Sequence, residues 1–238
     1  MAKEEKDFDR VMELESRKLA NEINREEIVR TQKLVGKNND MIALNIKEEL
    51  TQHNIKSFDI VGAIGSGKTA ILEKLAEKLG STNKILVICG DVTTRLDADR
   101  IQKKNVETKE INTGRECALN AYHIHKITEN IDLEKYDIIF VENVGNLICP
   151  SDFILGMDMR ITVVSVTEGE WVVEKHPLLF KMSEIAVINK IDLVERLNTD
   201  IEKMVNDAKK INPNIKVIQT STRTGEGIDK LMNAMGLS

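Results

Sequence analysis

Short apolar runs alternate with helical repeats along most of this 238-residue chain. Runs that are apolar at consecutive positions, such as Ile85-Leu86-Val87-Ile88, are typical of strands covered by helices on both faces. Strands that alternate with helices indicate βαβ units, so the pattern predicts an α/β fold with a mainly parallel central sheet flanked by helices. The expected strands are 58–61, 84–89, 136–141, 161–166, 184–189 and 215–219.

The first 52 residues follow a different pattern. They are rich in Glu, Lys, Arg and Asn, and Phe8, Met12, Leu19 and Ile23 fall near helical spacing. We interpret them as two helices separated at 36–40, where the chain reads Gly-Lys-Asn-Asn-Asp. The predicted organisation is an N-terminal helical extension, 1–52, and one α/β domain, 53–238. The charged extension either solvates a packing helix or serves as a docking arm for a partner.

A phosphate-binding loop follows the first strand. Residues 62–69 fit the pattern G-x-x-x-x-G-K-[ST], and a helical repeat over 70–79 follows and stops at Gly80. In such a loop backbone N–H groups surround the β-phosphate, Lys68 reaches the β- and γ-phosphates, and the Thr69 hydroxyl ligates Mg²⁺. The sequence therefore predicts a P-loop NTPase domain. Its expected nucleotide-binding residues here are Gly65, Ser66, Gly67, Lys68, Thr69 and Ala70.

A second motif selects the base. Asn189-Lys190-Ile191-Asp192 stands at the end of the 184–189 strand and forms an N-K-x-D box. An ionised Asp192 accepts two hydrogen bonds from the N1–H and the 2-amino group of guanine. Adenine offers an acceptor at N1 and has no 2-amino group, which costs roughly 1–3 kcal/mol. The box predicts GTP and GDP as the nucleotides, and residues 220–225 could close over the base from the other side.

Several acidic residues are candidates for holding Mg²⁺ and for catalysis alongside Lys68. Asp91 stands at the carboxyl end of the 84–89 strand, and Asp97 and Asp99 follow it beside Arg95 and Arg100. Helix capping and surface charge are the alternative roles of Asp97 and Asp99, so Asp91 is the favoured ligand.

The stretch Glu142-Asn143-Val144-Gly145 follows another strand end. This position suits a carboxylate near Mg²⁺ and a glycine N–H that meets the γ-phosphate. Asn146 occupies the position where faster GTPases often carry a water-orienting glutamine, so we expect slow turnover.

Composition narrows the class of partner. With 34 Lys+Arg against 39 Asp+Glu, the net charge of −5 provides no electrostatic footprint for nucleic acid or an anionic membrane. Aromatic residues make up 3% of the chain, which disfavours base-stacking surfaces. No apolar run approaches the roughly 20 residues that span a bilayer, and the start has no signal-peptide core. We expect a cytoplasmic protein with no nucleic-acid and no membrane partner.

The three cysteines are candidates for metal binding. In a reducing compartment they argue against a disulfide framework, which leaves core packing, metal ligation or chemistry. Cys89 lies inside an apolar strand and is interpreted as a core residue. Cys117 opens a predicted helix and Cys149 follows Gly145 by four residues, so both lie near the expected switch loops. Thiolates favour borderline metals such as Zn²⁺ or Ni²⁺, although two cysteines alone do not complete a site.

Taken together, these motifs resemble the HypB family of GTPases, which assist nickel insertion into [NiFe]-hydrogenase. The resemblance covers about residues 56–235. It implies that Cys117 and Cys149 bind Ni²⁺ or Zn²⁺ near the interface of a homodimer that forms on GTP binding, and that nickel passes to a delivery partner and to the hydrogenase large subunit. The stretches that carry it are 62–69, 90–92, 112–117, 142–150, 174–177 and 189–193.

The chain departs from the family at Ala118, where a metal-binding histidine is expected. The candidates to complete the coordination sphere are Glu116, His123, His125, solvent and cysteines of a second subunit. On a continuous helix His123 is about 240° from Cys117, whereas His125 is about 80° away but two turns distant. Ordinary surface residues are the alternative role of both histidines.

The leading hypothesis is a GTP-hydrolysing nickel metallochaperone. The related alternative is a urease-assembly GTPase, but that family carries a Cys-Pro-His motif where this chain has Cys149-Pro150-Ser151. A GTP-regulated assembly protein without metal is an alternative from another class, favoured by Ala118. A small-molecule P-loop kinase is a third, and it has no evident use for the N-K-x-D box.

Overall fold

The computed structural model describes residues 25–91, 100–102, 106–113 and 116–237, with the side chains of 25–35 and of Asp91 left out of the description. The chain divides into two units at Asn38/Asn39, and the sheet lies in the second, residues 39–238. The boundary expected between residues 52 and 53 stays a prediction; in the structure, helix residues 39–52 group with the sheet. Asp97, Asp99, Arg95 and the candidate helical residues before Arg25 lie outside the described residues.

A seven-stranded parallel sheet forms the centre of the second unit, in the order β3-β2-β4-β1-β5-β6-β7. This confirms the α/β P-loop fold with a parallel sheet. The strands are β1 (Lys56–Gly62), β2 (Ile85–Asp91), β3 (Glu107–Asn112), β4 (Ile138–Glu142), β5 (Met159–Ser165), β6 (Ile185–Asn189) and β7 (Lys216–Gln219).

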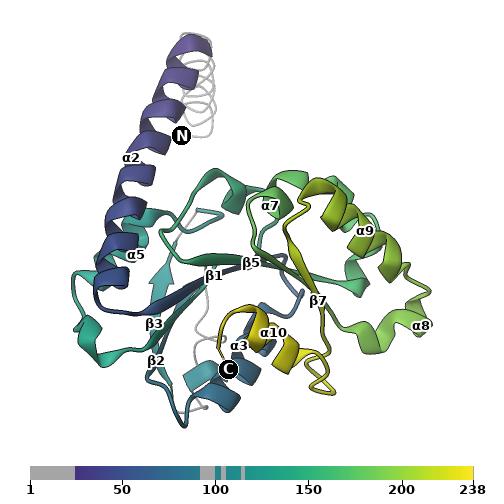
Figure 1. Cartoon of the computed structure of the whole chain (residues 1–238). Helices are drawn as coiled ribbons and strands as arrows, with labels where there is room; N and C mark the ends of the chain where they lie inside the picture. The colour runs from purple at the N-terminus through teal and green to yellow at the C-terminus, as the bar shows by residue number, and fades with distance from the viewer. Residues whose placement is uncertain (1–24, 92–99, 103–105, 114–115, 238) are drawn as a thin grey trace, which may run out of the picture. The chain divides into compact units, whose positions relative to one another are not determined.

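Helices cover both faces of the sheet, with α3 and α10 on one face and α5, α7 and α9 on the other (Figure 1). The α-helices are α2 (Arg25–Gln52), α3 (Lys68–Leu79), α5 (Ala121–Thr128), α6 (Val172–Lys175), α7 (Pro177–Lys181), α8 (Val194–Leu197), α9 (Ile201–Ile211) and α10 (Ile228–Ala234). Short 3₁₀ helices are η1 (Leu133–Lys135), η2 (Cys149–Asp152), η3 (Val166–Glu168) and η4 (Ile191–Leu193).

Alternation along each strand sends neighbouring side chains into different cores. On β1, Phe58 and Ile60 face the core beneath α3 and α10, where Phe58 stacks on Phe140 with ring centroids 5.4 Å apart. On β4, Ile139 and Val141 face the opposite core with α5. Near-complete burial of both faces explains why the inner strands are apolar at consecutive positions.

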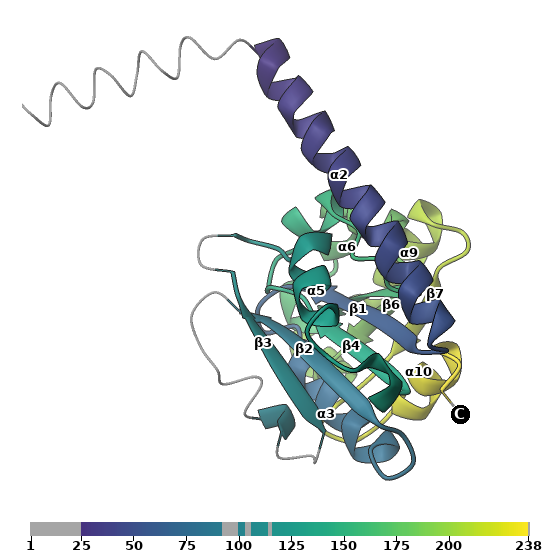
Figure 2. The ribbon, with the colours of Figure 1, turned by 90° about the vertical axis from the view of Figure 1, so that its left-hand side faces the viewer.

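The edge strand β3 was not among the expected strands. Its sequence, Glu-Thr-Lys-Glu-Ile-Asn, has no apolar run, and it pairs only with β2, at the edge of the sheet (Figure 2). None of its side chains is buried. Charged edge strands of this kind are common in natural sheets because they oppose pairing with another chain, and they carry little hydrophobic signal.

The expected break between helices at 36–40 was wrong, because α2 continues through this stretch. The segment contains no proline, and glycine or asparagine costs a helix only about 1 kcal/mol or less per residue. Asn39 offsets part of this cost: its Nδ2 donates to the Ile154 carbonyl at 2.9 Å, and its Oδ1 accepts from the Ala121 N–H at 2.8 Å. Tertiary hydrogen bonds therefore secure a helix that the local sequence disfavours.

No helix in the described part of the chain is both long enough and apolar enough to cross a membrane.

Candidate nucleotide and metal site

The loop between β1 and α3 has the conformation that phosphate binding requires. Gly65 and Gly67 adopt positive φ angles of 80° and 104°, which residues with a Cβ atom rarely adopt. Lys68 Nζ donates to the carbonyls of Gly62 at 3.0 Å and Ala63 at 3.1 Å, so the ammonium lies over the loop. Ser66 Oγ is buried and has no hydrogen-bond partner within the described residues, which fits a loop that receives an external polar group.

Two of the three expected Mg²⁺ ligands lie in contact. Thr69 Oγ1 donates to Glu142 Oε1 at 2.7 Å. Both side chains are buried, Thr69 in the first turn of α3 and Glu142 at the carboxyl end of β4. A hydroxyl and a carboxylate in contact are a fitting oxygen pair for a hard cation. Asp91 is the last residue of β2, which pairs with β4 on the side opposite β1. It therefore also lies at the carboxyl ends of the strands, but its side chain is outside the described set.

Gly145 packs directly against the phosphate-binding loop. A Cβ at this position would lie 2.4 Å from Ile64 Cγ1 and 3.1 Å from the Ile64 nitrogen. A side chain here would force Ile64 to shift, so glycine favours this approach of the two backbones. The peptide expected to meet the γ-phosphate therefore lies beside the loop expected to bind it.

The N-K-x-D box contacts the phosphate-binding loop. Asn189 is fully buried; its Nδ2 donates to the Ser66 carbonyl at 3.0 Å, and its Oδ1 accepts from Thr220 Oγ1 at 3.1 Å. Lys190 has a left-handed backbone, with φ of 63°, and its Nζ donates to the Gly65 carbonyl at 2.6 Å. The two residues fix the loop of the N-K-x-D box to the loop of residues 62–69.

Asp192 is held in position by the loop after β7. Its Oδ1 accepts from Ser221 Oγ at 2.6 Å, and its Oδ2 lies 3.7 Å from Arg223 Nη1. The side chain of Asp192 is mostly buried, whereas that of Arg223 is largely exposed. Residues 220–225 thus lie against Asp192, the carboxylate expected to select guanine.

Glu168 is a residue of this region that sequence reasoning missed. Burial raises the pKa of its carboxyl group, while the hydrogen bond from the Ser165 N–H at 2.8 Å and the charges of Lys190 and Lys68 oppose the shift. Its Oε2 is buried with no hydrogen-bond partner among the residues described. The available signal was the spacing Ser165-x-x-Glu168 after β5, which forms a capping box on η3.

Cys117 and Cys149 come together, although they are 32 residues apart in sequence. The structure joins them in a disulfide, with their Cα atoms 6.1 Å apart, while Cys89 is buried in β2 outside this pair. The expectation of no disulfide was wrong for this pair. It rested on compartment alone, whereas the fold holds the two Cα atoms within the range of 4.4–6.8 Å that favours a bond. When reduced, two sulfurs this close can bind the same metal ion.

The surroundings of Cys117 differ from the expected helix. α5 begins at Ala121 with Asn120 as its N-cap, so Cys117 precedes the helix and the angular comparison with His123 and His125 does not apply. The helix begins after Asn120 and not at Cys117, because Asn120 Oδ1 accepts from the His123 N–H and so caps the first turn of α5. Ala118 is buried.

Neither histidine joins the cysteines. His123 Nε2 lies 3.7 Å from Glu116 Oε2, and His125 Nε2 lies 3.0 Å from Glu129 Oε1. In the described part of the chain, no group of three or more His, Cys, Asp or Glu side chains has the arrangement of a metal site. Among the described residues, two thiol ligands therefore come together here without a third.

Asn146 contacts the cysteine loop. Its Oδ1 accepts from the N–H groups of Ile148 at 2.7 Å and Cys149 at 3.2 Å. The side chain in the position where other GTPases orient water is thus engaged in holding the backbone of Cys149.

A P-loop after β1, a Thr–carboxylate pair and an N-K-x-D box on one sheet edge define the class of this protein: a P-loop nucleotide-binding protein of the α/β type. Within that class, residues 57–219 match the family model described as "CobW/HypB/UreG, nucleotide-binding domain". The chain belongs to this family, and within it to HypB, as its relatives show.

One curated relative is a probable hydrogenase maturation factor HypB of Methanocaldococcus jannaschii. It is 46% identical over 82% of this chain and 89% of its own length. The hydrogenase maturation factor HypB of Azotobacter chroococcum is 38% identical over 83% of this chain, which spans 64% of that longer protein.

Solved structures give the same family. The hydrogenase maturation factor HypB of Archaeoglobus fulgidus superposes with a TM-score of 0.77 and 41% identity, over 83% of this chain and 96% of that one. HypB of Helicobacter pylori, solved in complex with nickel, superposes with a TM-score of 0.77 and 34% identity, over 82% and 92% of the two chains.

Proposed function

We propose that this protein is a cytoplasmic GTPase that delivers nickel during [NiFe]-hydrogenase maturation. The observation that carries the proposal is the pairing of Cys117 with Cys149. Cys149 lies on the segment that directly follows residues 142–145, which contact the phosphate-binding loop and Thr69. A relative that is solved with nickel supports the choice of cargo. The names of the relatives support the process.

In this proposal the nucleotide half of the site hydrolyses GTP to GDP and phosphate. Lys68 stabilises charge on the β- and γ-phosphates, the Gly145 N–H meets the γ-phosphate, and Asp192 selects guanine. Thr69, Asp91 and Glu142 would hold Mg²⁺, which neutralises phosphate charge when bound. Turnover is slow, because Asn146 is shorter than a glutamine and its oxygen already accepts two backbone N–H groups.

The cargo half of the site uses the two thiolates. After reduction, Cys117 and Cys149 bind Ni²⁺, with Zn²⁺ as a competing ion of similar ligand preference. Because the chain brings only two such ligands together within its described residues, the remaining ligands come from solvent or from a second copy. A homodimer formed on GTP binding would supply two further cysteines across its two-fold axis. A nickel-delivery protein and the hydrogenase large subunit are the proposed partners.

A second candidate is a GTP-regulated assembly protein that carries no metal. It is favoured by Ala118, which is buried and cannot ligate, and by the absence of a three-ligand group among the described residues. A urease-type role is less well supported, because Ser151 stands where that family has its histidine; its Oγ donates to the Ile148 carbonyl at 2.6 Å.

Equilibrium dialysis of the fully reduced protein against Ni²⁺ and Zn²⁺ separates these candidates. We expect about one-half or one nickel per chain, depending on whether two chains share an ion, and loss of that binding in Cys117→Ala and in Cys149→Ala. Cys89→Ala is the matched control, because Cys89 is a buried thiol of β2 outside the pair, and it should keep the wild-type stoichiometry.

Absence of cysteine-dependent nickel and zinc would reject metal delivery and favour the assembly protein. A parallel turnover assay with ATP in place of GTP tests the nucleotide half separately. Comparable hydrolysis of ATP would contradict the role assigned to Asp192.

A further inference from the structure

Asn143, next to Glu142, connects one cysteine-bearing segment to the interior of the sheet. Its side chain is buried, and its Oδ1 accepts from the N–H groups of Leu119 at 2.9 Å and Val144 at 3.0 Å. Leu119 lies two residues after Cys117. The amide of Asn143 therefore fixes the backbone on which Cys117 stands.

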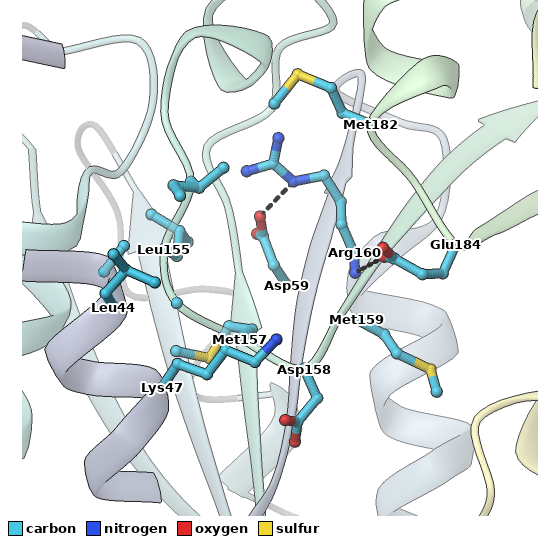
Figure 3. A pocket seen from close by; sticks show the side chains of 13 residues that line it. Leu44, Lys47, Asp59, Leu155, Met157, Asp158, Met159, Arg160, Met182 and Glu184 are labelled. Carbon is cyan, nitrogen blue, oxygen red and sulfur yellow. Dashed lines mark hydrogen bonds and ion pairs between the residues drawn. The ribbon is translucent and has the colours of Figure 1, made fainter. Parts of the chain in front are cut away.

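The other end of the same amide contacts a buried ion pair. Asn143 Nδ2 donates to Asp59 Oδ1 at 3.2 Å, and the second oxygen of Asp59 accepts from Arg160 Nε at 2.8 Å. Asp59 and Arg160 are register partners on β1 and β5, with relative exposures of 2% and 7%. Figure 3 shows the Asp59 carboxylate directed at the guanidinium in the wall of an open cavity of about 260 Å³.

Arg160 continues the chain of contacts to the second cysteine. Its Nη1 donates to the carbonyl of Pro150 at 2.9 Å, and its Nη2 donates to the carbonyl of Phe153 at 2.5 Å. Pro150 directly follows Cys149, and the two carbonyls belong to the turn of η2 and its cap. The guanidinium therefore fixes the backbone on which Cys149 stands.

The three side chains form one buried chain of polar contacts from Leu119 to Pro150. A buried charge or amide that loses its partner is strongly unfavourable, so the contacts depend on one another. This series of polar contacts is also joined to the nucleotide site. Asn143 follows Glu142, which accepts from Thr69, and the Asn143 N–H donates to the Ile60 carbonyl of β1 at 2.9 Å.

We propose that Asn143, anchored by Asp59 and Arg160, is the positioning residue that holds Cys117 and Cys149 at bonding distance and transmits movement of Glu142 to them. The positioning step stands on these contacts alone. The transmission step rests on the proposed GTP-dependent function. Both steps are tested without nickel.

The experiment measures how strongly the fold favours the bond between the two cysteines. The full-length protein is equilibrated in buffers of reduced and oxidised glutathione, and the Cys117–Cys149 bond is quantified by peptide mapping. In the reaction two protein thiols and one oxidised glutathione give one protein disulfide and two reduced glutathiones, so the protein loses two electrons that glutathione gains. The equilibrium constant is the effective concentration of one thiol at the other.

Asn143→Asp keeps the oxygen that accepts from Leu119 but places a carboxylate against Asp59. We expect it to lower the effective concentration about tenfold or more, the size associated with losing a buried hydrogen bond to a charged group. A double variant, Asp59→Asn with Asn143→Asp, swaps the two side chains. It restores one amide donor and one carboxylate acceptor at positions 59 and 143. We expect this double variant to recover most of the loss.

Ser183→Ala is the matched control. Ser183 is buried beside the same sheet, and its Oγ bonds Thr162 Oγ1 at 2.6 Å and donates to the Leu179 carbonyl at 2.8 Å, away from the cysteines. It should leave the effective concentration within about twofold of wild type. An equal fall in this control, or an unchanged value in Asn143→Asp, would overturn the positioning role.

The transmission step has its own outcome. In wild type, Mg²⁺ with a non-hydrolysable GTP analogue should change the effective concentration relative to Mg²⁺ with GDP, and Asn143→Asp should lose this change. The same nucleotide response in both proteins would refute transmission through Asn143. If positioning is confirmed but the reduced wild type binds no nickel, the proposed function fails and the positioning role stands.

Discussion

At the residue scale, the proposed selection of guanine depends on how the Asp192 carboxylate is fixed. Ser221 donates to one oxygen of Asp192, which leaves the second oxygen 3.7 Å from the exposed guanidinium of Arg223. Asp192→Asn can keep the Ser221 contact through its carbonyl oxygen and present an NH₂ group to the base. That group suits the 2-carbonyl of xanthine better than the 2-amino group of guanine.

We therefore expect Asp192→Asn to weaken GDP binding about tenfold to a hundredfold and to strengthen binding of xanthosine diphosphate. Competition with a fluorescent nucleotide measures both affinities. Asp200→Asn is a suitable control, because Asp200 caps α9 through its Oδ1 and asparagine caps equally well. Unchanged base preference in Asp192→Asn would contradict the assigned role.

Glu168 should contribute a pH dependence to stability. Burial raises the pKa of its carboxyl group above the ordinary 4.5, so the folded state holds this proton more tightly than the unfolded state. The cost of ionisation is absent below the ordinary pKa, grows as pH rises through the window up to the raised pKa, and is fully present above it.

Replacing Glu168 by Gln removes this titration. The free energy of unfolding of wild type, measured against that of Glu168→Gln by urea denaturation, should fall as pH rises above the ordinary pKa of 4.5. A difference that stays constant over this range, or changes in the opposite direction, would show that the carboxyl group is not desolvated in the folded protein.

The nucleotide motifs could be recognised in the sequence because each is contiguous and lies next to a strand end. The buried hydrogen-bond network of Arg160, Asp59 and Asn143 could not be predicted from sequence. Its members come from β5, from β1 and from the residue after β4, which are far apart in the sequence. Asp59 offered a signal that was not used: a charged residue inside an otherwise apolar, buried strand requires a partner. The contact between Cys117 and Cys149 was expected from the resemblance to HypB, but their disulfide was not.

At the element scale, prediction succeeded where burial dictates the pattern. The inner strands were found because helices cover both of their faces, whereas β3 carries charged residues at the sheet edge and was missed. The continuity of α2 through residues 36–40 depends in part on the bonds of Asn39 to Ile154 and Ala121, which no local pattern could reveal.

The packing of α2 residues 39–52 on the sheet unit is tested at Gly156. Gly156 and Gly169 share a φ of +83°, but a Cβ at Gly156 would lie 2.2 Å from the Ala43 carbonyl oxygen of α2, whereas nothing lies within 4 Å of one at Gly169. Alanine at either position should cost about 1–3 kcal/mol for the positive φ, which only glycine adopts readily. At Gly156 the clash with backbone should add about 1–3 kcal/mol.

Urea denaturation of Gly156→Ala and Gly169→Ala measures this difference. Equal losses of stability would mean that the approach of residue 156 to α2 is not part of the folded state.

At the scale of the whole molecule, the parallel sheet explains why the nucleotide residues and the cysteine pair both lie at the carboxyl ends of the strands. All strands present their carboxyl ends to the same side, so the loops after β1, β4 and β6 meet there. Residues 142–149 then run without interruption from the carboxylate beside Thr69 to the second cysteine. In the proposed cycle this segment lets the γ-phosphate alter the binding of a metal ion, and metal binding alters nucleotide affinity by the same factor.

The most direct test of this account is the Kd of the reduced protein for Ni²⁺, measured with saturating Mg²⁺ and either GDP or a non-hydrolysable GTP analogue. The account predicts tighter nickel binding with the GTP analogue, by about fivefold or more, and loss of the nickel site in Cys149→Ala in both states. Equal nickel affinity in the two nucleotide states would contradict coupling between GTP and metal. Nickel binding that survives the loss of Cys149 would contradict the site itself.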